Sequence, residues 1–273
     1  MAQPGGRPVS LREAIPVGVA EDGSVVSVNL GERHELVGGE PGGGKSNVQS
    51  QVVATAALDP SVKLWLFDGK LVELAVWRGC AETFVGPDLE EANDALRQLR
   101  AVMEFRYGEL LACGRRKVDA SDGLHLVVVD ELAMYLTADR RESKEFSSLL
   151  RDLVARGRAA GVIVVAATQK PSSDIVATSL RDLFSYRWAL RCSTPQASDT
   201  VLGQGWASQG YSASSIDPAD RGLGLLLHEG GRPVRLKSFH LSDQDLVAIA
   251  RRAEALRRSQ APLRVVEPVG ASS

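Results

Sequence analysis

Apolar and polar positions along the chain follow two alternating patterns. Short runs rich in Val, Ile and Leu predict β-strands at residues 25–29, 35–37, 62–67, 126–129, 162–167, 186–190, 223–227 and 233–237. Between the third and fourth runs, apolar residues recur at three- and four-residue steps over residues 89–110. This spacing predicts an amphipathic helix that opens at Pro87 and Asp88. A second helix precedes the fifth strand, and its apolar face carries Phe146, Leu149, Leu150, Leu153 and Val154.

The same pattern suggests how the chain is organised. We expect a loose leader at residues 1–14, one domain at 15–241, a helix at 242–260 and a tail at 261–273. The last helix should turn Leu246, Ile249, Ala253 and Leu256 inward. Its outward face should carry Arg251, Arg252, Arg257 and Arg258. Strands that alternate with helices indicate an α/β fold whose mostly parallel sheet is covered by helices on both faces.

Composition and charge narrow the class of protein. The 273 residues are 44% hydrophobic and 24% charged, which is ordinary for a globular chain. The longest apolar stretches fall short of the roughly 20 residues that cross a bilayer, and no secretory signal opens the chain, so we expect a cytoplasmic protein. Three scattered cysteines suggest free thiols. With a net charge of −2, any binding to nucleic acid must be local.

A phosphate-binding pattern stands at residues 34–46, which read HELVGGEPGGGKS. An apolar strand leads into Gly39-x-x-x-x-Gly44-Lys45-Ser46, and a helix-compatible stretch follows, as a P-loop requires. Lys45 would reach the β- and γ-phosphates of ATP, and Ser46 would ligate Mg²⁺. Four glycines, Gly39, Gly42, Gly43 and Gly44, would allow the backbone to wind round the phosphates with its N–H groups pointing inward. The alternative is a glycine-rich turn with an incidental lysine.

One residue of this loop is unusual. Glu40 places a carboxylate close to the expected triphosphate, which is unfavourable unless the side chain points to solvent.

An acidic pair follows a second apolar strand, in the segment LHLVVVDEL at residues 124–132. Asp130 would hold Mg²⁺ through water, and Glu131 would polarise the attacking water as general base. A solvated turn is the alternative. The strand at 62–67 lies between the phosphate-loop strand and this one, and the glutamate follows the aspartate directly. Both features favour a motor-type ATPase over a GTPase or a small-molecule kinase.

Polar side chains also end the next strand, at Thr168 and Gln169. Gln169 would sit beside the γ-phosphate and report hydrolysis to the loop that follows, although an ordinary strand cap gives the same pattern. Arg156 and Arg158 lie just ahead of this strand. In a ring of subunits one of them could reach the neighbour's nucleotide as an arginine finger, and a solvated helix end is the alternative.

Further segments accompany these motifs: LWLFDGKLVEL at 64–74, MEFRY at 103–107, GRAAGVIVVAATQKPSSDIV at 157–176 and SDTVLGQG at 198–205. Together they resemble the motor domain of the FtsK/SpoIIIE family of double-stranded DNA translocases, over about residues 15–241. The resemblance implies a RecA-like P-loop NTPase core of the additional-strand, catalytic-glutamate (ASCE) type. Such cores form hexameric rings that thread duplex DNA and move it by ATP hydrolysis.

The resemblance also carries roles over to individual residues. It implies that Arg158 is the finger and that the nucleotide is handled by Lys45, Ser46, Asp130, Glu131 and Gln169. Lys170 stands where the family usually has arginine, with the charge kept. DNA phosphates would be held by basic loops, for which the candidates are Arg115, Arg116 and Lys117 and, after Gln169, Lys170 and Arg181. A solvated turn is an equal alternative for residues 115–117.

Three biological roles follow from the resemblance. Septal family members add transmembrane helices and a winged-helix module, and the residues after Leu241 are too few for the latter. The chain therefore looks like the short transfer proteins of actinomycete conjugative plasmids and integrative elements, and a membrane-anchored partner would recruit it to the membrane face. The alternatives are a chromosome-segregation DNA pump and a protein-export ATPase of the type VII secretion kind.

Overall fold

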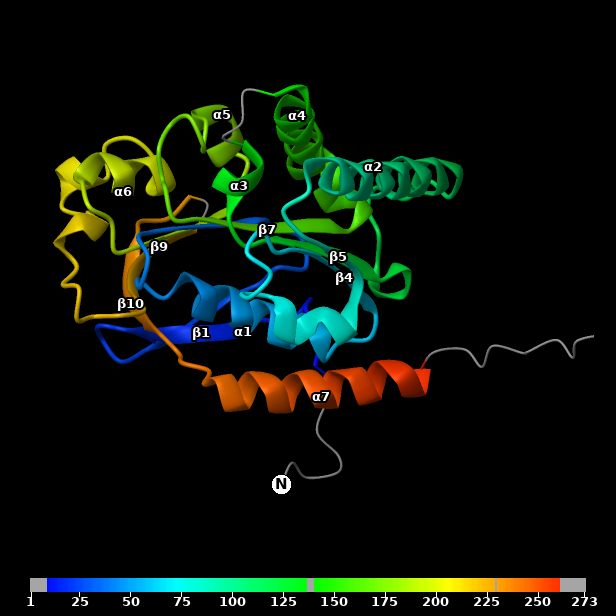
Figure 1. The fold of residues 1–273 in the computed structure, drawn as a ribbon, viewed down its shortest axis with the longest axis horizontal. Helices are drawn as coiled ribbons and strands as arrows, with labels where there is room; N and C mark the ends of the chain where they lie inside the picture. Colours follow the sequence, from blue (N-terminus) through cyan, green and yellow to red (C-terminus); the bar gives the residue numbers. More distant parts are fainter. Residues whose placement is uncertain (1–8, 137–139, 229, 261–273) are drawn as a thin grey trace, which may run out of the picture.

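The computed structural model describes residues 9–136, 140–228 and 230–260, and within them ten strands form one mixed sheet (Figure 1). The strands are β1 (Ile15–Ala20), β2 (Val25–Val28), β3 (Glu35–Gly38), β4 (Val62–Phe67), β5 (Ala81–Val85), β6 (Leu124–Val129), β7 (Val162–Thr168), β8 (Tyr186–Leu190), β9 (Leu223–His228) and β10 (Val234–Ser238). Their order is β2-β1-β10-β9-β8-β3-β7-β6-β4-β5. The block from β8 to β5 is parallel and the rest is antiparallel, which confirms a mostly parallel α/β sheet.

All eight expected strands are present, and the sequence pattern missed two. β1 contains Pro16 and Gly18, which weaken a strand signal. At Gly18 an added Cβ would lie 2.3 Å from the Lys237 carbonyl oxygen, so the glycine allows β10 to approach closely. β5 (AETFV) is short and half polar. Neither strand has the continuous apolar run by which buried strands are recognised.

The strand order settles which strand separates the phosphate loop from the acidic pair. Along the chain it is β4, but in the sheet β4 lies on the far side of β6. β7 is the strand inserted between β3 and β6, and it is parallel to both. The carboxyl ends of β3, β7 and β6 therefore meet at one edge of the sheet, which we call the carboxyl edge.

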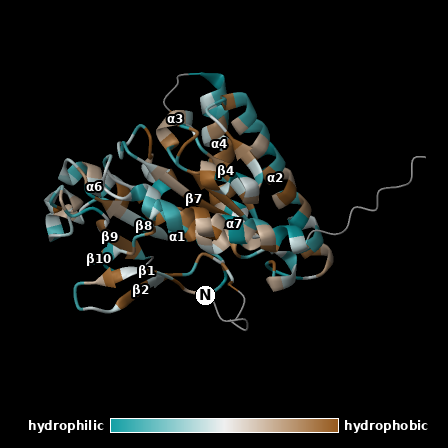
Figure 2. Ribbon diagram, turned by 60° about the horizontal axis from the view of Figure 1, so that its bottom comes forward, coloured by the Kyte–Doolittle hydropathy of each residue, from teal (hydrophilic) through white to brown (hydrophobic). Residues whose placement is uncertain are grey.

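Helices cover both faces of the sheet, as expected (Figure 1). α2 (Leu89–Ala112) and α4 (Arg141–Arg156) pack on one face, and α1 (Lys45–Ala57) and α7 (Asp243–Gln260) lie on the other. Figure 2 shows hydrophobic residues concentrated on the central strands between these layers. α2 begins where the sequence predicts, because the Asp88 carboxylate accepts hydrogen bonds from the N–H groups of Glu90 and Glu91. The short helices are α3 (Leu132–Leu136), α5 (Thr178–Arg181) and α6 (Pro195–Leu202).

Two expectations about the ends of the domain are wrong. Leu11 is fully buried, and its N–H donates to the Asp59 carboxylate at 3.0 Å, so packing begins before Ile15. Arg257 does not face outward. Its guanidinium donates to the carbonyl oxygens of residues 56, 57 and 59 at 2.8–3.0 Å, at and just after the carboxyl end of α1. The tail expected at residues 261–273 lies outside the described residues.

No helix in the described ranges is both long and apolar enough to cross a membrane.

Candidate nucleotide site

The phosphate loop joins β3 to α1 at the carboxyl edge. Its last glycine, Gly44, has a φ of 105°, and an added Cβ would lie 3.0 Å from the backbone of Gly222, so both conformation and space require glycine. Gly42 is also left-handed, with a φ of 78°. No side chain caps the start of α1, although helix N-termini usually receive such a cap. The N–H groups of its first turn are therefore available to an anion.

Lys45 is the first residue of α1, and its ammonium group turns back onto the backbone of the loop. Nζ donates to the carbonyl oxygens of Gly39 at 2.8 Å and Glu40 at 3.3 Å. Burial lowers the Lys45 pKa to about 8, and Glu131 opposes this shift. A buried ammonium with mainly neutral partners is costly, and phosphate oxygens would relieve that cost.

A cavity of about 840 Å³ opens beside the loop. One wall comes from the loop and the start of α1, including Lys45 and Ser46. The other walls come from the 70–73 segment, Gln169 and residues near β9 and β10: Arg221, Gly222, Lys237, Ser238 and His240. Binding cavities for small molecules and cofactors commonly measure 300–1,000 Å³, so this one has room for a nucleoside triphosphate.

Asp130 follows β6 directly, and only one of its carboxylate oxygens has a protein partner. Oδ1 accepts from the N–H of Gly69 at 3.0 Å, whereas Oδ2 is buried with no hydrogen-bond partner among the described residues. Burial raises the Asp130 pKa to about 7, and the neighbouring carboxylates of Asp68 and Glu131 act in the same direction. An oxygen acceptor left open in this way fits a water molecule of hydrated Mg²⁺. Ser46, the other expected magnesium ligand, lines the cavity.

Glu131 is held by the end of β7. Oε1 accepts from the Thr168 hydroxyl at 2.9 Å and Oε2 from the Gln169 N–H at 2.8 Å. The sequence noted Thr168 only as the end of a strand, because nothing in the sequence shows that β7 lies beside β6. The carboxylate is thus connected to Gln169, the expected sensor residue, and to the loop that follows it.

The sequence also missed residues that shape the cavity rim. Asp68 is fully buried and accepts from the N–H groups of Lys70 at 3.2 Å and Leu74 at 2.8 Å. These bonds order the turn that places Lys70 and Glu73 at the cavity. The segment FDGKLVEL contributed to the family resemblance, but the sequence did not reveal this structural role of Asp68.

The unusual Glu40 is compensated rather than solvated. Its Oε2 lies 2.6 Å from Nη1 of Arg191, and both side chains are only 25% exposed. The carboxylate is thus neutralised by a cation that follows β8 directly, and not by exposure to solvent.

The finger candidates lie at the opposite edge of the sheet, which we call the amino edge. Arg158 stands just before β7, is exposed, and has no ion pair with any residue in 9–136, 140–228 or 230–260. It is therefore remote from the phosphate loop of its own chain, as a residue acting on a neighbour would be. Arg156 is instead paired with Asp152 and Glu104, at 2.6 Å each.

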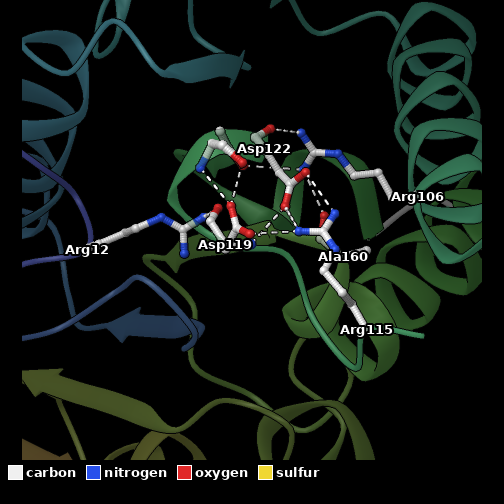
Figure 3. Close-up of polar contacts among 8 residues, drawn as sticks. Arg12, Arg106, Arg115, Asp119, Asp122 and Ala160 are labelled. Carbon is white, nitrogen blue, oxygen red and sulfur yellow. Dashed lines mark hydrogen bonds and ion pairs between the residues drawn. The ribbon is translucent and has the colours of Figure 1, made fainter. Parts of the chain in front are cut away.

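Most of the DNA candidates are engaged within the protein. Arg115 pairs with Asp119 and Asp122 at 2.8 Å each, in the amino-edge network drawn in Figure 3. Lys117 pairs with Glu32. The remaining candidates divide into two exposed residues, Arg116 and Lys170, and one buried residue, Arg181.

Arg181 is therefore a wrong candidate for DNA contact. Its side chain is 6% exposed and pairs with Asp182 at 2.8 Å, so no external phosphate can reach it in this fold. Lys170 is 63% exposed, follows Gln169, and lies 3.9 Å from the Asp174 carboxylate.

Together, the loop, the acidic pair and the intervening strand define a P-loop nucleoside triphosphatase with an added strand, β7, between β3 and β6. Residues 6–125 match the family model named FtsK/SpoIIIE family. The chain has the fold of the P-loop class, and its residues 6–125 are similar to the FtsK/SpoIIIE family.

Sequence relatives support this assignment. The chain is 30% identical over 260 residues to the DNA translocase FtsK of Tropheryma whipplei, covering 85% of this chain and 34% of that protein. It is 27% identical to the DNA translocase FtsK of Staphylococcus epidermidis, covering 85% of this chain and 31% of the relative. The chain thus spans about a third of the length of these relatives.

Solved structures show the same fold. The pCW3 conjugation coupling protein TcpA, in its monomer form with ATPγS, has a TM-score of 0.75 and 18% identity, covering 92% of this chain and 72% of that one. The type VII secretion ATPase EccC of Thermomonospora curvata has a TM-score of 0.73 and 21% identity, covering 92% of this chain and 32% of that one.

Proposed function

We propose that this protein is an ATP-driven translocase of double-stranded DNA. The observation that carries the proposal is that Lys45 lines a cavity of nucleotide size, while Asp130 and Glu131 follow β6 at the same edge of the sheet. Relatives that bear the name DNA translocase supply the substrate class.

In the proposed reaction, each residue acts where the geometry puts it. The loop N–H groups and Lys45 bind the phosphates, and Ser46 and Asp130 would hold Mg²⁺, which neutralises phosphate charge when bound. Glu131 accepts a proton as water oxygen attacks the γ-phosphorus, and the bridging oxygen leaves with ADP. Glu131 also accepts a hydrogen bond from the Gln169 N–H. When this hydrogen bond breaks, the loop that carries Lys170 moves.

A ring of identical subunits would complete the site. Arg158 lies at the amino edge, away from its own phosphate loop, so it can serve only the nucleotide of an adjoining protomer. We propose a homo-oligomer, a hexamer as the resemblance to the FtsK/SpoIIIE family implies. In it, Arg158 stabilises the charge of the phosphoryl group during its transfer. DNA phosphates would contact Lys170 and Arg116, which are exposed and, unlike the exposed Lys117, do not form a close ion pair with a carboxylate among the described residues.

For the biological process, we propose conjugal transfer of a plasmid or integrative element. The likeness to a conjugation coupling protein over 92% of the chain favours it. A chromosome-segregation pump is the second candidate, favoured by the FtsK relatives. A protein-export motor is the third, since one similar EccC structure is in complex with a signal sequence peptide.

The central test couples ATP hydrolysis to movement along DNA. We expect duplex DNA to stimulate the ATPase severalfold and the protein to displace the third strand of a DNA triplex only while ATP is hydrolysed. Lys45→Ala, which removes the phosphate-binding ammonium, should abolish both. Arg235→Ala, which breaks an exposed ion pair with Glu21, is the matched control and should change neither.

The outcomes separate the candidates. Equal ATPase rates with and without DNA, with no strand displacement, would overturn the DNA motor. Retention of signal peptides instead of DNA would point to protein export. In a plot of log DNA affinity against log salt concentration, Lys170→Ala should reduce the steepness of the slope by about one unit, because one fewer counterion is released. Lys117→Ala should change this slope less, because Lys117 is already paired with Glu32.

A further inference from the structure

The phosphate loop carries a negative charge of its own. Glu40 is the second residue of the loop, and its backbone carbonyl accepts from Nζ of Lys45 at 3.3 Å. Its side chain lines a second cleft of about 430 Å³ that also contains Gln169 and Lys170. Gln169 borders both this cleft and the 840 Å³ cavity. The carboxylate therefore lies on the side of the loop where the sensor residue stands.

A free carboxylate at this position would oppose binding of a triphosphate. Like charges a few ångströms apart repel strongly where protein replaces water around them. Asp130 and Glu131 already place two carboxylates at the same edge, and both are buried. A third uncompensated carboxylate in the loop would act directly against the anion that the loop binds.

Arg191 meets this charge from the carboxyl end of β8 and contacts the loop in three ways. Nη1 lies 2.6 Å from Oε2 of Glu40, and Nη2 donates to the carbonyl oxygen of Pro41 at 3.4 Å. The Arg191 carbonyl oxygen accepts from the Glu40 N–H at 2.8 Å. At Gly39 an added Cβ would lie 3.1 Å from that same carbonyl oxygen, so backbone and side chain of Arg191 both support the loop.

We propose that Arg191 is a positioning residue for nucleotide binding: it cancels the charge of Glu40, so that the triphosphate meets a net positive surface. The inference rests on the proposed function, because it concerns the same nucleotide site. Arg191 sets affinity for the anion and takes no part in the transfer of the phosphoryl group. Its loss therefore raises the KM for ATP and leaves kcat nearly unchanged.

A double-mutant cycle on the full chain tests this role, with Kd for Mg²⁺ and a fluorescent ATP analogue as the readout. Arg191→Ala should weaken binding about tenfold, because the Glu40 charge is then exposed to the phosphates. Glu40→Gln should bind about threefold more tightly, because the arginine charge is then uncompensated. The double variant should return to within about twofold of the wild type, and Arg191→Lys should recover most of the affinity.

The decisive result is the effect of removing Glu40 when Arg191 is already absent. If the double variant binds as weakly as Arg191→Ala, then Arg191 acts on the nucleotide or on loop geometry, and charge cancellation is overturned. Should Arg191→Ala fold poorly by thermal unfolding, Arg191→Gln removes the charge with less loss of volume and gives the same reading. Arg235→Ala is the control for loss of an arginine from an ion pair elsewhere.

Failure of this inference can be distinguished from failure of the proposed function. A wild-type chain that binds no nucleotide overturns both. A wild type that binds and hydrolyses ATP, while the cycle shows no coupling between residues 40 and 191, overturns only the role of Arg191.

Discussion

The two edges of the parallel sheet treat charge in opposite ways. At the carboxyl edge, the Asp130 Oδ2 atom has no hydrogen-bond partner among the described residues, and burial raises the Asp130 pKa to about 7. At the amino edge, hydrogen bonds from Arg115 and from the backbone lower the Asp122 pKa to about 2 (Figure 3). The carboxyl edge thus contains a buried carboxylate with an unpaired oxygen, whereas at the amino edge Asp119 and Asp122 are paired with Arg115.

The difference shows how a binding edge can be told from a structural one. A buried polar atom without a partner costs free energy, so a stable fold tolerates it where a ligand completes the set. Charges that pair within the protein order the chain and leave little for an external partner. The cationic run at 115–117 looks like a DNA contact in the sequence, but two of its three charges already have carboxylate partners.

The largest expected effect comes from changing one aspartate at each edge to asparagine. Asp130→Asn should lower the ATPase rate by at least about a hundredfold, because the ligand-facing charge is lost. Its free energy of unfolding without nucleotide should not fall, because the variant no longer buries an incompletely paired carboxyl group. Steady-state ATPase assays and urea unfolding of the nucleotide-free protein measure the two effects.

Asp122→Asn is the matched change and should give the opposite result. It weakens the pairing with Arg115, so it should lower the free energy of unfolding and leave kcat unchanged. If instead Asp122→Asn impaired hydrolysis while Asp130→Asn did not, the distinction between the two edges would be wrong.

A second prediction concerns Arg106, which joins α2 to the amino edge. Its guanidinium donates to the carbonyl oxygens of Asp122 at 2.6 Å and Ala160 at 2.8 Å. Arg106→Met keeps the apolar stem and leaves these acceptors without a donor, so the free energy of unfolding should fall by about 2 kcal/mol. The affinity of the folded protein for ATP should stay within about twofold of the wild type, because the changed contacts are at the edge away from its own phosphate loop. A large loss of ATP affinity without a fall in stability would contradict this.

Sequence patterns predicted the fold well where periodicity was strong. The eight apolar runs became strands, and α2 begins at the residues expected, because a buried sheet and an amphipathic helix depend on local spacing. The sequence pattern did not predict β1 and β5, because strands at or near an edge of the sheet need no continuous apolar run. The insertion of β7 between β3 and β6 could not come from spacing, since it depends on chain topology.

The sequence predicted those residues of the site that belong to sequence motifs. Lys45 and Asp130 lie where the patterns placed them, because strand-to-helix turns have a fixed geometry. The pairing of Glu40 with Arg191 was not predictable, because the two residues lie far apart in the sequence. For the same reason the burial of Arg181 and the inward turn of Arg257 were missed: each depends on a partner brought near only by folding.

The smallest predicted effect lies between the two edges, in β3. Glu35 is fully buried, both of its carboxylate oxygens lack a partner among the described residues, and burial raises its pKa to about 8. Between the ordinary value of 4.5 and about 8, the folded state holds a proton that the unfolded state has lost. Stability therefore falls as pH rises through this window, by about 1 kcal/mol per pH unit.

The contribution of Glu35 can be isolated between pH 7 and 8. Burial lowers the pKa of His34 to about 3, so its opposing contribution is complete above its ordinary value of 6.5. The Asp130 contribution ends near pH 7. Lys45, whose pKa burial lowers to about 8, makes stability rise over the same interval. Urea unfolding should therefore show the stability of Glu35→Gln rising from pH 7 to 8, and the change for the wild type should be lower by about 1 kcal/mol over the interval. Equal slopes for the two proteins would mean that the carboxyl group is ionised in the fold, and that an unpaired buried acid need not mark a binding edge.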